Sequence, residues 1–192
     1  MFSPDDLVLI RHAAADHQGR LCGRTDVGLA PDTKGPLQRL APVLTTVTDL
    51  RVSPALRCRL TADALWPGTT QAEDDRLWEQ DFGDWEGLPF TDLPDLGVLS
   101  PSDLAARTPP GGESFLDLAA RVTPALKEAA RAAREQGPVV VVAHAGVVRA
   151  GISMALAHAT AGLSFEIAPL SITRIGCLET GFSVRAANWN PA

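Results

Sequence analysis

Residues 7–13 read "LVLIRHA", an apolar run that leads directly into an arginine and a histidine. A second stretch, "VVVVAHAG" at residues 139–146, repeats the order of apolar run, histidine and small residue. Short apolar runs without alternation are typical of strands that are buried on both faces, as in a parallel sheet. Each run therefore predicts a central strand, with His12 or His144 just past its carboxyl end.

Two helical patterns lie between these predicted strands. Apolar residues recur at helical spacing from 37 to 47, although Pro42 must kink or shorten that helix. Further on, Ser53 is placed as an N-cap, with Pro54 at the first helical position. A helix is therefore predicted to begin there, directly after the short strand "DLRVS" at residues 49–53.

The rest of the chain continues the alternation of strands and helices. "TTQAEDDRL" at residues 69–77 allows another strand, and helices are predicted from Phe115 to Gly137-Pro138 and over residues 146–158. The last segment predicts a hairpin that turns at Thr180-Gly181. The order of elements predicts an α/β fold with three layers, α/β/α, around a mostly parallel central sheet.

Composition limits the classes of function. The 192 residues fit one domain, which we place over residues 1–192. A net charge of −6 argues against a general binder of nucleic acid or of anionic membranes. The three scattered cysteines imply neither a disulfide framework nor a metal site. The sequence indicates neither a signal peptide nor a membrane span, so we expect a cytoplasmic protein.

Arg11 and His12 are costly residues at the end of a buried strand. An arginine cannot lose its proton, so it needs an anion or a carboxylate partner there. A neutral imidazole beside it can act as a nucleophile. The carboxyl ends of parallel strands carry the ligand site in such sheets, which allows His144 to share that site. The combination favours an oxyanion such as phosphate; the alternative is that each histidine is only a structural residue.

The sequence lacks the motifs of other phosphate-binding sites. No cysteine has an arginine six positions further on, and no G-x-x-x-x-G-K-[ST] loop occurs. His-x-His and Cys-x-x-Cys spacings are also missing. We therefore expect no metal and no cofactor.

Five motifs together resemble the histidine phosphatase superfamily, the phosphoglycerate-mutase-like enzymes. They are "LIRHA", "SPALRCRLTA", "LWEQDFGDWEG", "PPGGESF" and "VVAHAGVVRA", in family order across nearly the whole chain. The resemblance implies a phosphoglycerate-mutase-like fold, a single histidine-phosphatase-like domain and a phosphomonoesterase activity. "CGRTDVGLAPD" and "DFGDWEG" look most like the alpha-ribazole phosphatase branch, which implies alpha-ribazole 5′-phosphate, in cobalamin biosynthesis, as the leading substrate.

The resemblance also implies roles for individual residues. His12 would be the nucleophile that becomes a phosphohistidine, and Glu79 would be the proton donor. Arg11, Arg57 and His144 would grip the phosphoryl oxygens, where charge must be stabilised. Only the resemblance selects Glu79 from the acids of its loop, since such a run is typical of a solvated face. Four further residues would contact the phosphate or the rest of the substrate: Arg24, Thr25, Gln18 and Ala145.

The sequence departs from the family pattern at four positions. Ala13 and Ala14 stand where the family has a glycine and an acid, Gln18 stands for an asparagine, and Ala145 stands for a glycine. Where a glycine's conformational freedom was used, an alanine would cost about 1 kcal/mol or more. These changes leave the mechanism standing and weaken the prediction of a particular substrate.

Alternatives remain open at this point. The nearest alternative substrate is a sugar phosphate or another small phosphomonoester. A phosphoglycerate-mutase-type activity is less favoured because the sequence shows no obvious insertion to enclose a bisphosphorylated intermediate. A different class is a non-catalytic phosphate-binding protein on the same fold, which Glu79 argues against and Ala13 and Ala14 keep open. We expect a small phosphorylated substrate, no nucleic-acid or membrane partner, and a monomer or homodimer.

Overall fold

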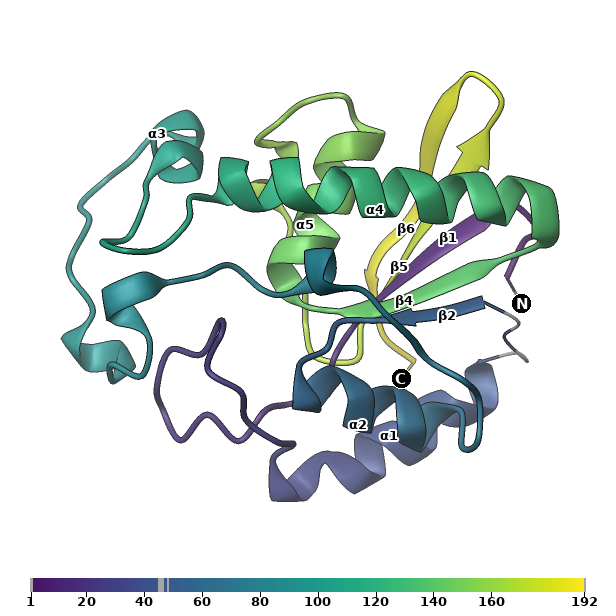
Figure 1. Ribbon diagram of the computed structural model, residues 1–192, viewed down its shortest axis with the longest axis horizontal. Coiled ribbons are helices and arrows are strands. Elements are labelled where there is room, and N and C mark those ends of the chain that lie inside the picture. The colour runs from purple at the N-terminus through teal and green to yellow at the C-terminus, as the bar shows by residue number, and fades with distance from the viewer. Residues whose placement is uncertain (1, 45–46, 48, 192) are drawn as a thin grey trace.

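The computed structural model describes residues 2–44, 47 and 49–191, and its centre is a six-stranded sheet in the order β3-β2-β4-β1-β5-β6 (Figure 1). The strands are β1 (Asp6–Arg11), β2 (Asp49–Val52), β3 (Ala72–Glu73), β4 (Val139–Ala143), β5 (Ile172–Leu178) and β6 (Gly181–Trp189). The first four strands pair in parallel, whereas β5 pairs with β1, and β6 with β5, in antiparallel fashion. The prediction of a mostly parallel α/β sheet is confirmed.

Helices cover both faces of this sheet. They are α1 (Lys34–Leu40), α2 (Leu56–Leu65), α3 (Pro101–Ala106), α4 (Phe115–Gln136) and α5 (Ala145–Ala155). In Figure 1, α4 and α5 lie on one side of the strands, and α1 and α2 lie on the other. Among the residues described, no helix combines the length and the apolar character that a membrane span requires.

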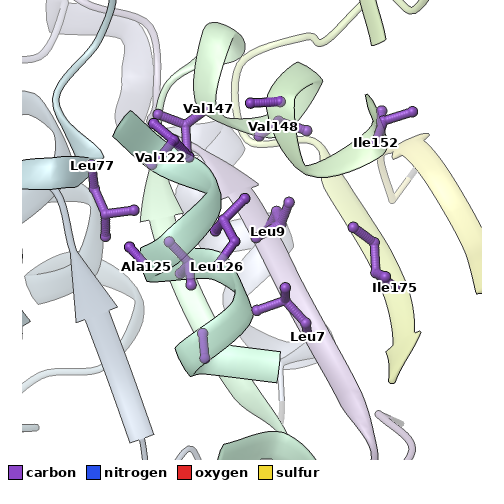
Figure 2. Packing of buried hydrophobic residues seen from close by; sticks show 14 of the residues in the cluster. Leu7, Leu9, Leu77, Val122, Ala125, Leu126, Val147, Val148, Ile152 and Ile175 are labelled. Carbon is purple, nitrogen blue, oxygen red and sulfur yellow. The ribbon is translucent and has the colours of Figure 1, made fainter. Parts of the chain in front are cut away.

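The strand β1 is buried on both faces because its side chains alternate between two cores. Leu7 and Leu9 pack in the core under α4 and α5, and Figure 2 shows them beside Leu126 of α4. Val8 and Ile10 point to the opposite face and pack in the core under α1 and α2. The unbroken apolar run at the start of the sequence is explained by this two-sided burial.

The helix α2 begins later than the sequence predicts. Its N-cap is Ala55 rather than Ser53, and the cap makes no side-chain hydrogen bond. Ser53 makes other contacts: its N–H donates to the Val142 carbonyl at 3.0 Å, and its hydroxyl is hydrogen-bonded to the ring of His144. The N–H of Leu56 is instead bonded by the carboxylate of Asp26 at 2.8 Å, from a distant loop.

Other bounds also differ from the prediction. The first helix ends at Leu40 and continues as a 3-10 turn over Ala41–Val43, so the expected effect of Pro42 is confirmed; positions 45, 46 and 48 of that pattern lie outside the described residues. The strand in 69–77 is limited to β3. Two further bounds shift: α5 ends at Ala155, and Leu178 pairs with Gly181, so the hairpin turns at Glu179-Thr180.

Three loops are tied together beyond the carboxyl ends of the parallel strands. Backbone bonds join residues 19–21 to residues 87–90: the Leu21 N–H reaches the Leu88 carbonyl at 2.9 Å, and the Phe90 N–H reaches the Gly19 carbonyl at 2.9 Å. Residues 81–84 are joined in the same way to residues 110–113. These loops form the rim of the site described next.

Candidate active site

The two histidines predicted at strand ends meet in the structure. Arg11 of β1 is in register with Ala143 of β4, so the residue that follows each strand lies at the same level. The His12 N–H donates to the Ala143 carbonyl at 2.9 Å. The imidazole rings of His12 and His144 pack edge to face with their centroids 5.2 Å apart. The expected convergence of the two strand ends is confirmed.

His12 is held in its neutral form. Its side chain is buried, and burial lowers its pKa to about 3, with Arg57 and Arg11 acting in the same direction. The Nδ1 atom lies 2.6 Å from the carbonyl oxygen of Ala13. Because a carbonyl only accepts, Nδ1 carries the proton and Nε2 keeps a free lone pair. This is the state in which an imidazole is a nucleophile.

His144 is fully buried at the amino end of α5, where it is the N-cap residue. Its Nε2 lies 2.8 Å from the hydroxyl oxygen of Ser53, and the Cys58 sulfur lies 3.6 Å from the same nitrogen. Burial lowers the pKa of His144 well below 6.5, and His12 and Arg57 add to the shift. The ring of Trp78 lies parallel to the imidazole, at a centroid distance of 6.5 Å.

Two arginines lie at the site without a carboxylate partner. Arg57 is 1% exposed, and its guanidinium donates to the carbonyl oxygens of Gly23 at 2.7 Å and Thr25 at 3.2 Å. Arg11 donates to the Ile167 carbonyl at 2.6 Å; burial lowers its pKa, and the charge of Glu79 opposes that shift. Neither arginine forms a salt bridge with any residue that the structure describes. Two largely buried cations without a carboxylate make a pocket for an anion.

Glu79 lies at the amino end of α5. Its Oε2 accepts from the Gly146 N–H at 3.2 Å, and its Oε1 accepts from the N–H of Gln80 at 3.0 Å. A helix N-terminus favours a carboxylate at this place. The close approach depends on Gly146, because a Cβ at that position would overlap the Oε1 atom. The structure thus places one acid of the crowded loop against Gly146, which is two residues after His144 in the sequence.

Arg121 of α4 holds the segment that carries Glu79. Its guanidinium donates to the carbonyl oxygens of Trp78 at 3.1 Å and Glu79 at 3.3 Å. It also pairs with the carboxylate of Glu113, which accepts from the N–H of Asp81 at 3.1 Å. Arg121 therefore connects the long helix to both ends of the Glu79 segment.

The predicted substrate-binding residues have different surroundings. The Arg24 guanidinium lies 5.6 Å from the centroid of the Trp78 ring, and its side chain is 35% exposed. The Thr25 hydroxyl donates to Glu86 at 2.6 Å, and the Thr25 carbonyl accepts from Arg57. Gln18 is exposed with a φ of 49°, and in the described chain no hydrogen bond connects it to the residues above.

The alanines that replace family glycines are not strained. Neither Ala13 nor Ala145 has a positive φ, so the expected penalty for losing a glycine does not apply at these positions. Ala13 is buried in the core under α1 and α2, and its N–H donates to the Thr61 hydroxyl at 3.0 Å. Ala145 is the first residue of α5, where a helical backbone suits alanine.

Four residues make contacts in or around the site that the sequence does not predict. Ser53 was expected to cap a helix and instead contacts His144. Glu86 is one of the acids in the Glu79 loop, a run that is typical of a solvated face, and it instead binds backbone amides. Trp78 lies inside the motif "LWEQDFGDWEG" but has no predicted role there, and Arg121 has no signal in the sequence, because an arginine in a long helix is an ordinary surface residue.

Comparison with known proteins identifies a family. The model of the histidine phosphatase superfamily (branch 1) matches residues 7–190. Among curated proteins, a glucosyl-3-phosphoglycerate phosphatase of Mycobacterium tuberculosis is 34% identical over 173 residues, which cover 78% of this chain and 74% of the relative. Similarity of this extent is enough to show the family.

Solved structures show the same architecture. The native structure of a mycobacterial glucosyl-3-phosphoglycerate phosphatase superposes with a TM-score of 0.83 at 27% identity, covering 97% of this chain and 99% of that one. An alpha-ribazole phosphatase from Shigella flexneri reaches a TM-score of 0.83 at 22% identity, with 96% of each chain covered. The second likeness is one of fold.

Proposed function

This chain belongs to the histidine phosphatase superfamily, and from that premise we propose that it is a metal-independent phosphomonoesterase that works through a phosphohistidine on His12. The observation that carries the proposal is a neutral, buried His12 beside two arginines that have no carboxylate partner. An anion is needed to balance those cations, and the imidazole lone pair is available to attack it. A phosphoryl group meets both requirements.

In the first step, Nε2 of His12 attacks phosphorus while the bond from phosphorus to the ester oxygen breaks. Glu79 gives its proton to the leaving oxygen, so the alcohol departs neutral. Arg11, Arg57 and His144 hold the phosphoryl oxygens as charge develops on them. When the Ser53 hydroxyl donates to Nε2 of the neutral His144, the imidazole proton is on Nδ1 of His144. That N–H is then the donor available to a phosphoryl oxygen.

In the second step, the roles of the carboxylate reverse. Glu79, now ionised, takes a proton from a water molecule, and the water oxygen attacks the phosphohistidine. The bond between phosphorus and Nε2 breaks, and inorganic phosphate leaves. His12 returns to its neutral form with the lone pair on Nε2, because Nδ1 stays bonded to the Ala13 carbonyl throughout.

Two substrates are supported by different observations. The name of the M. tuberculosis relative favours a phosphoglycerate attached to a sugar, which is one of the other small phosphomonoesters. Alpha-ribazole 5′-phosphate is supported by the motif "CGRTDVGLAPD" and by likeness of fold. We place the sugar-linked phosphoglycerate first because the relative that carries it is similar in sequence as well as in fold.

The test is release of phosphate in the presence of EDTA, first from p-nitrophenyl phosphate and then from both proposed substrates and a set of sugar phosphates. We expect turnover by the wild type and by His158→Ala, a control at an exposed histidine, and none by His12→Ala. Unchanged activity in His12→Ala would exclude this nucleophile. A wild type that binds vanadate but hydrolyses no phosphomonoester would replace the proposal with a phosphate-binding protein.

A further inference from the structure

Glu86 takes no part in the chemistry above, yet its half-buried carboxylate accepts several hydrogen bonds. Its oxygens accept from three consecutive backbone N–H groups, those of Gly23 at 3.0 Å, Arg24 at 2.8 Å and Thr25 at 3.0 Å. The Thr25 hydroxyl adds a bond of 2.6 Å. Burial by itself would raise the pKa of Glu86, but these hydrogen bonds outweigh it and lower the pKa. Glu86 is therefore a fixed anion beneath the 23–25 loop.

The opposite side of the same loop holds Arg57. The carbonyl oxygens of Gly23 and Thr25 accept from its guanidinium, at 2.7 Å and 3.2 Å. The Gly23 carbonyl and the Arg24 N–H belong to one peptide group, so a single peptide lies between the Glu86 carboxylate and the Arg57 guanidinium. Its N–H faces the anion and its carbonyl faces the cation, which is the favourable orientation at both ends.

The loop has little freedom to hold Arg57 in any other way. A Cβ at Gly23 would overlap the Gln80 carbonyl and approach Glu86, so the loop is pressed against the 80–86 segment. Without the carboxylate, three neighbouring amides would lose their acceptor at once, and loops that lose such bonds are the first parts of a protein to open. Arg57 is 1% exposed and depends on this loop for the hydrogen bonds that set its direction.

We propose that Glu86 is a positioning residue for the phosphatase reaction: it fixes the Gly23 and Thr25 carbonyls, and through them the direction of the Arg57 guanidinium in the phosphoryl pocket. The inference rests on the proposed function. Glu86 does not touch the substrate, so its effect reaches the reaction only through Arg57. Loss of Glu86 weakens binding of a phosphoryl group or its analogue, but where Arg57 is already absent the loss of Glu86 adds little more.

The test compares Glu86→Gln with Asp84→Asn. Both changes remove one negative charge from the same loop, but Asp84 is exposed and its side chain forms no hydrogen bond or ion pair within the described residues. The measurements are kcat/KM on p-nitrophenyl phosphate and the inhibition constant of vanadate. We expect Glu86→Gln to lower kcat/KM by about tenfold to a hundredfold and to weaken vanadate by a similar factor, and Asp84→Asn to stay within about twofold.

A double-mutant cycle with Arg57→Ala separates positioning from an independent role. If Glu86 acts through Arg57, adding Glu86→Gln to Arg57→Ala lowers kcat/KM by less than about twofold further. Thr25→Val, which removes one of the bonds to Glu86, is a milder variant and is expected to lose activity to a smaller extent. It keeps the test valid should Glu86→Gln fold poorly.

Multiplying losses in the cycle, or a Glu86→Gln variant that matches Asp84→Asn, would overturn the inference. Vanadate affinity separates this result from failure of the proposed function. A wild type that binds vanadate without turnover contradicts the function, while the positioning role is still decided by the vanadate constants of the two variants.

Discussion

His12 combines burial with a strictly assigned tautomer. Its ring is buried, and burial, Arg57 and Arg11 all lower its pKa and so disfavour a second proton. The Ala13 carbonyl accepts from Nδ1, so the nucleophilic nitrogen is defined without a carboxylate partner. The same arrangement costs stability in acid, because the unfolded chain binds the proton that the folded chain refuses.

We expect the free protein to lose stability as pH falls below 6.5. The pKa of His12 is lowered from 6.5 to about 3 in the folded state, so between these values the unfolded state binds more protons. Each such histidine lowers the free energy of unfolding by up to about 1.4 kcal/mol per pH unit. Urea unfolding in phosphate-free buffers from about pH 7.5 to about pH 5 measures the slope. His12→Asn should flatten it, whereas the exposed His158→Asn should not; equal slopes in all three would contradict the shift.

Glu79→Gln tests the proton donor. A glutamine cannot protonate a leaving alkoxide, so hydrolysis of alkyl phosphates is expected to fall by about a hundredfold or more, while aryl phosphates, whose leaving groups need little help, lose less. The measurement is kcat/KM for one substrate of each kind, because this ratio reports the steps up to departure of the alcohol and leaves out the second step, in which Glu79 serves both substrates alike. Equal losses on both would assign the proton to another residue.

Gly146→Ala tests the geometry around the same carboxylate. The new Cβ would overlap Oε1 of Glu79 and contact Leu118 at 3.0 Å, so the carboxylate must move. We expect kcat on alkyl phosphates to fall by about tenfold or more with little change in vanadate affinity, since the arginines are untouched. Gly35→Ala, in α1, where a Cβ would make only an ordinary contact of 3.7 Å with the Arg39 side chain, serves as the control and should keep full activity.

The helices differ in how their first turns are bonded. Ser114 and Asp117 form a capping box at the start of α4, in which the Ser114 hydroxyl accepts from the Asp117 N–H at 3.1 Å. The first turn of α2 is bonded by Asp26 from another loop instead. A capping residue that adjoins its helix can be predicted from the spacing of residues in the sequence. A capping carboxylate from a distant loop, such as that of Asp26, cannot.

Ser114→Ala is expected to lower the free energy of unfolding by about 1 kcal/mol, because α4 loses a bonded N-cap and covers one face of the sheet. Thermal and urea unfolding measure the loss. Ser100→Ala, at the equivalent position of the short, exposed α3, should cost less. A larger loss for Ser114→Ala than for Ser100→Ala would show that an N-cap contributes more stability when its helix is packed against the core.

In the molecule as a whole, an ion-pair network joins the start of the chain to its last hairpin. Asp6 of β1 is fully buried and pairs with Arg174 of β5 and Arg185 of β6, each at 2.7 Å. Asp5 pairs with Arg185 as well, but from a more exposed position. The network attaches the antiparallel strands to the edge of the parallel sheet.

Asp6→Asn should therefore destabilise the whole fold. Loss of a buried carboxylate bonded to two arginines is expected to cost about 1–3 kcal/mol, since the half-exposed arginines can still reach water. Asp5→Asn, which removes a more exposed charge, should cost less. Urea unfolding compares them; equal costs would show that burial of Asp6 contributes nothing.

Much of the site can be predicted from local pattern, and the rest cannot. His12 and His144 are found because each follows a buried strand, and parallel strands end at one edge. Glu79 is selected among its neighbours only by resemblance or by the Gly146 contact. Glu86 lies in the same acidic run and looks equivalent in sequence, yet the structure turns it under the 23–25 loop. The two acids differ in their partners, which come from distant parts of the chain.

The buried strands, the long helices and the two strand ends that carry the histidines follow from local sequence, because periodicity depends on neighbouring residues. Three features depend on the folded chain: which acid meets α5, which carboxylate holds the loop around Arg57, and the contact of Ser53 with His144 in place of a helix cap. Those outcomes depend on hydrogen bonds between segments that are far apart in sequence. Their energies are set by distances and burial that exist only once the sheet and its loops have come together.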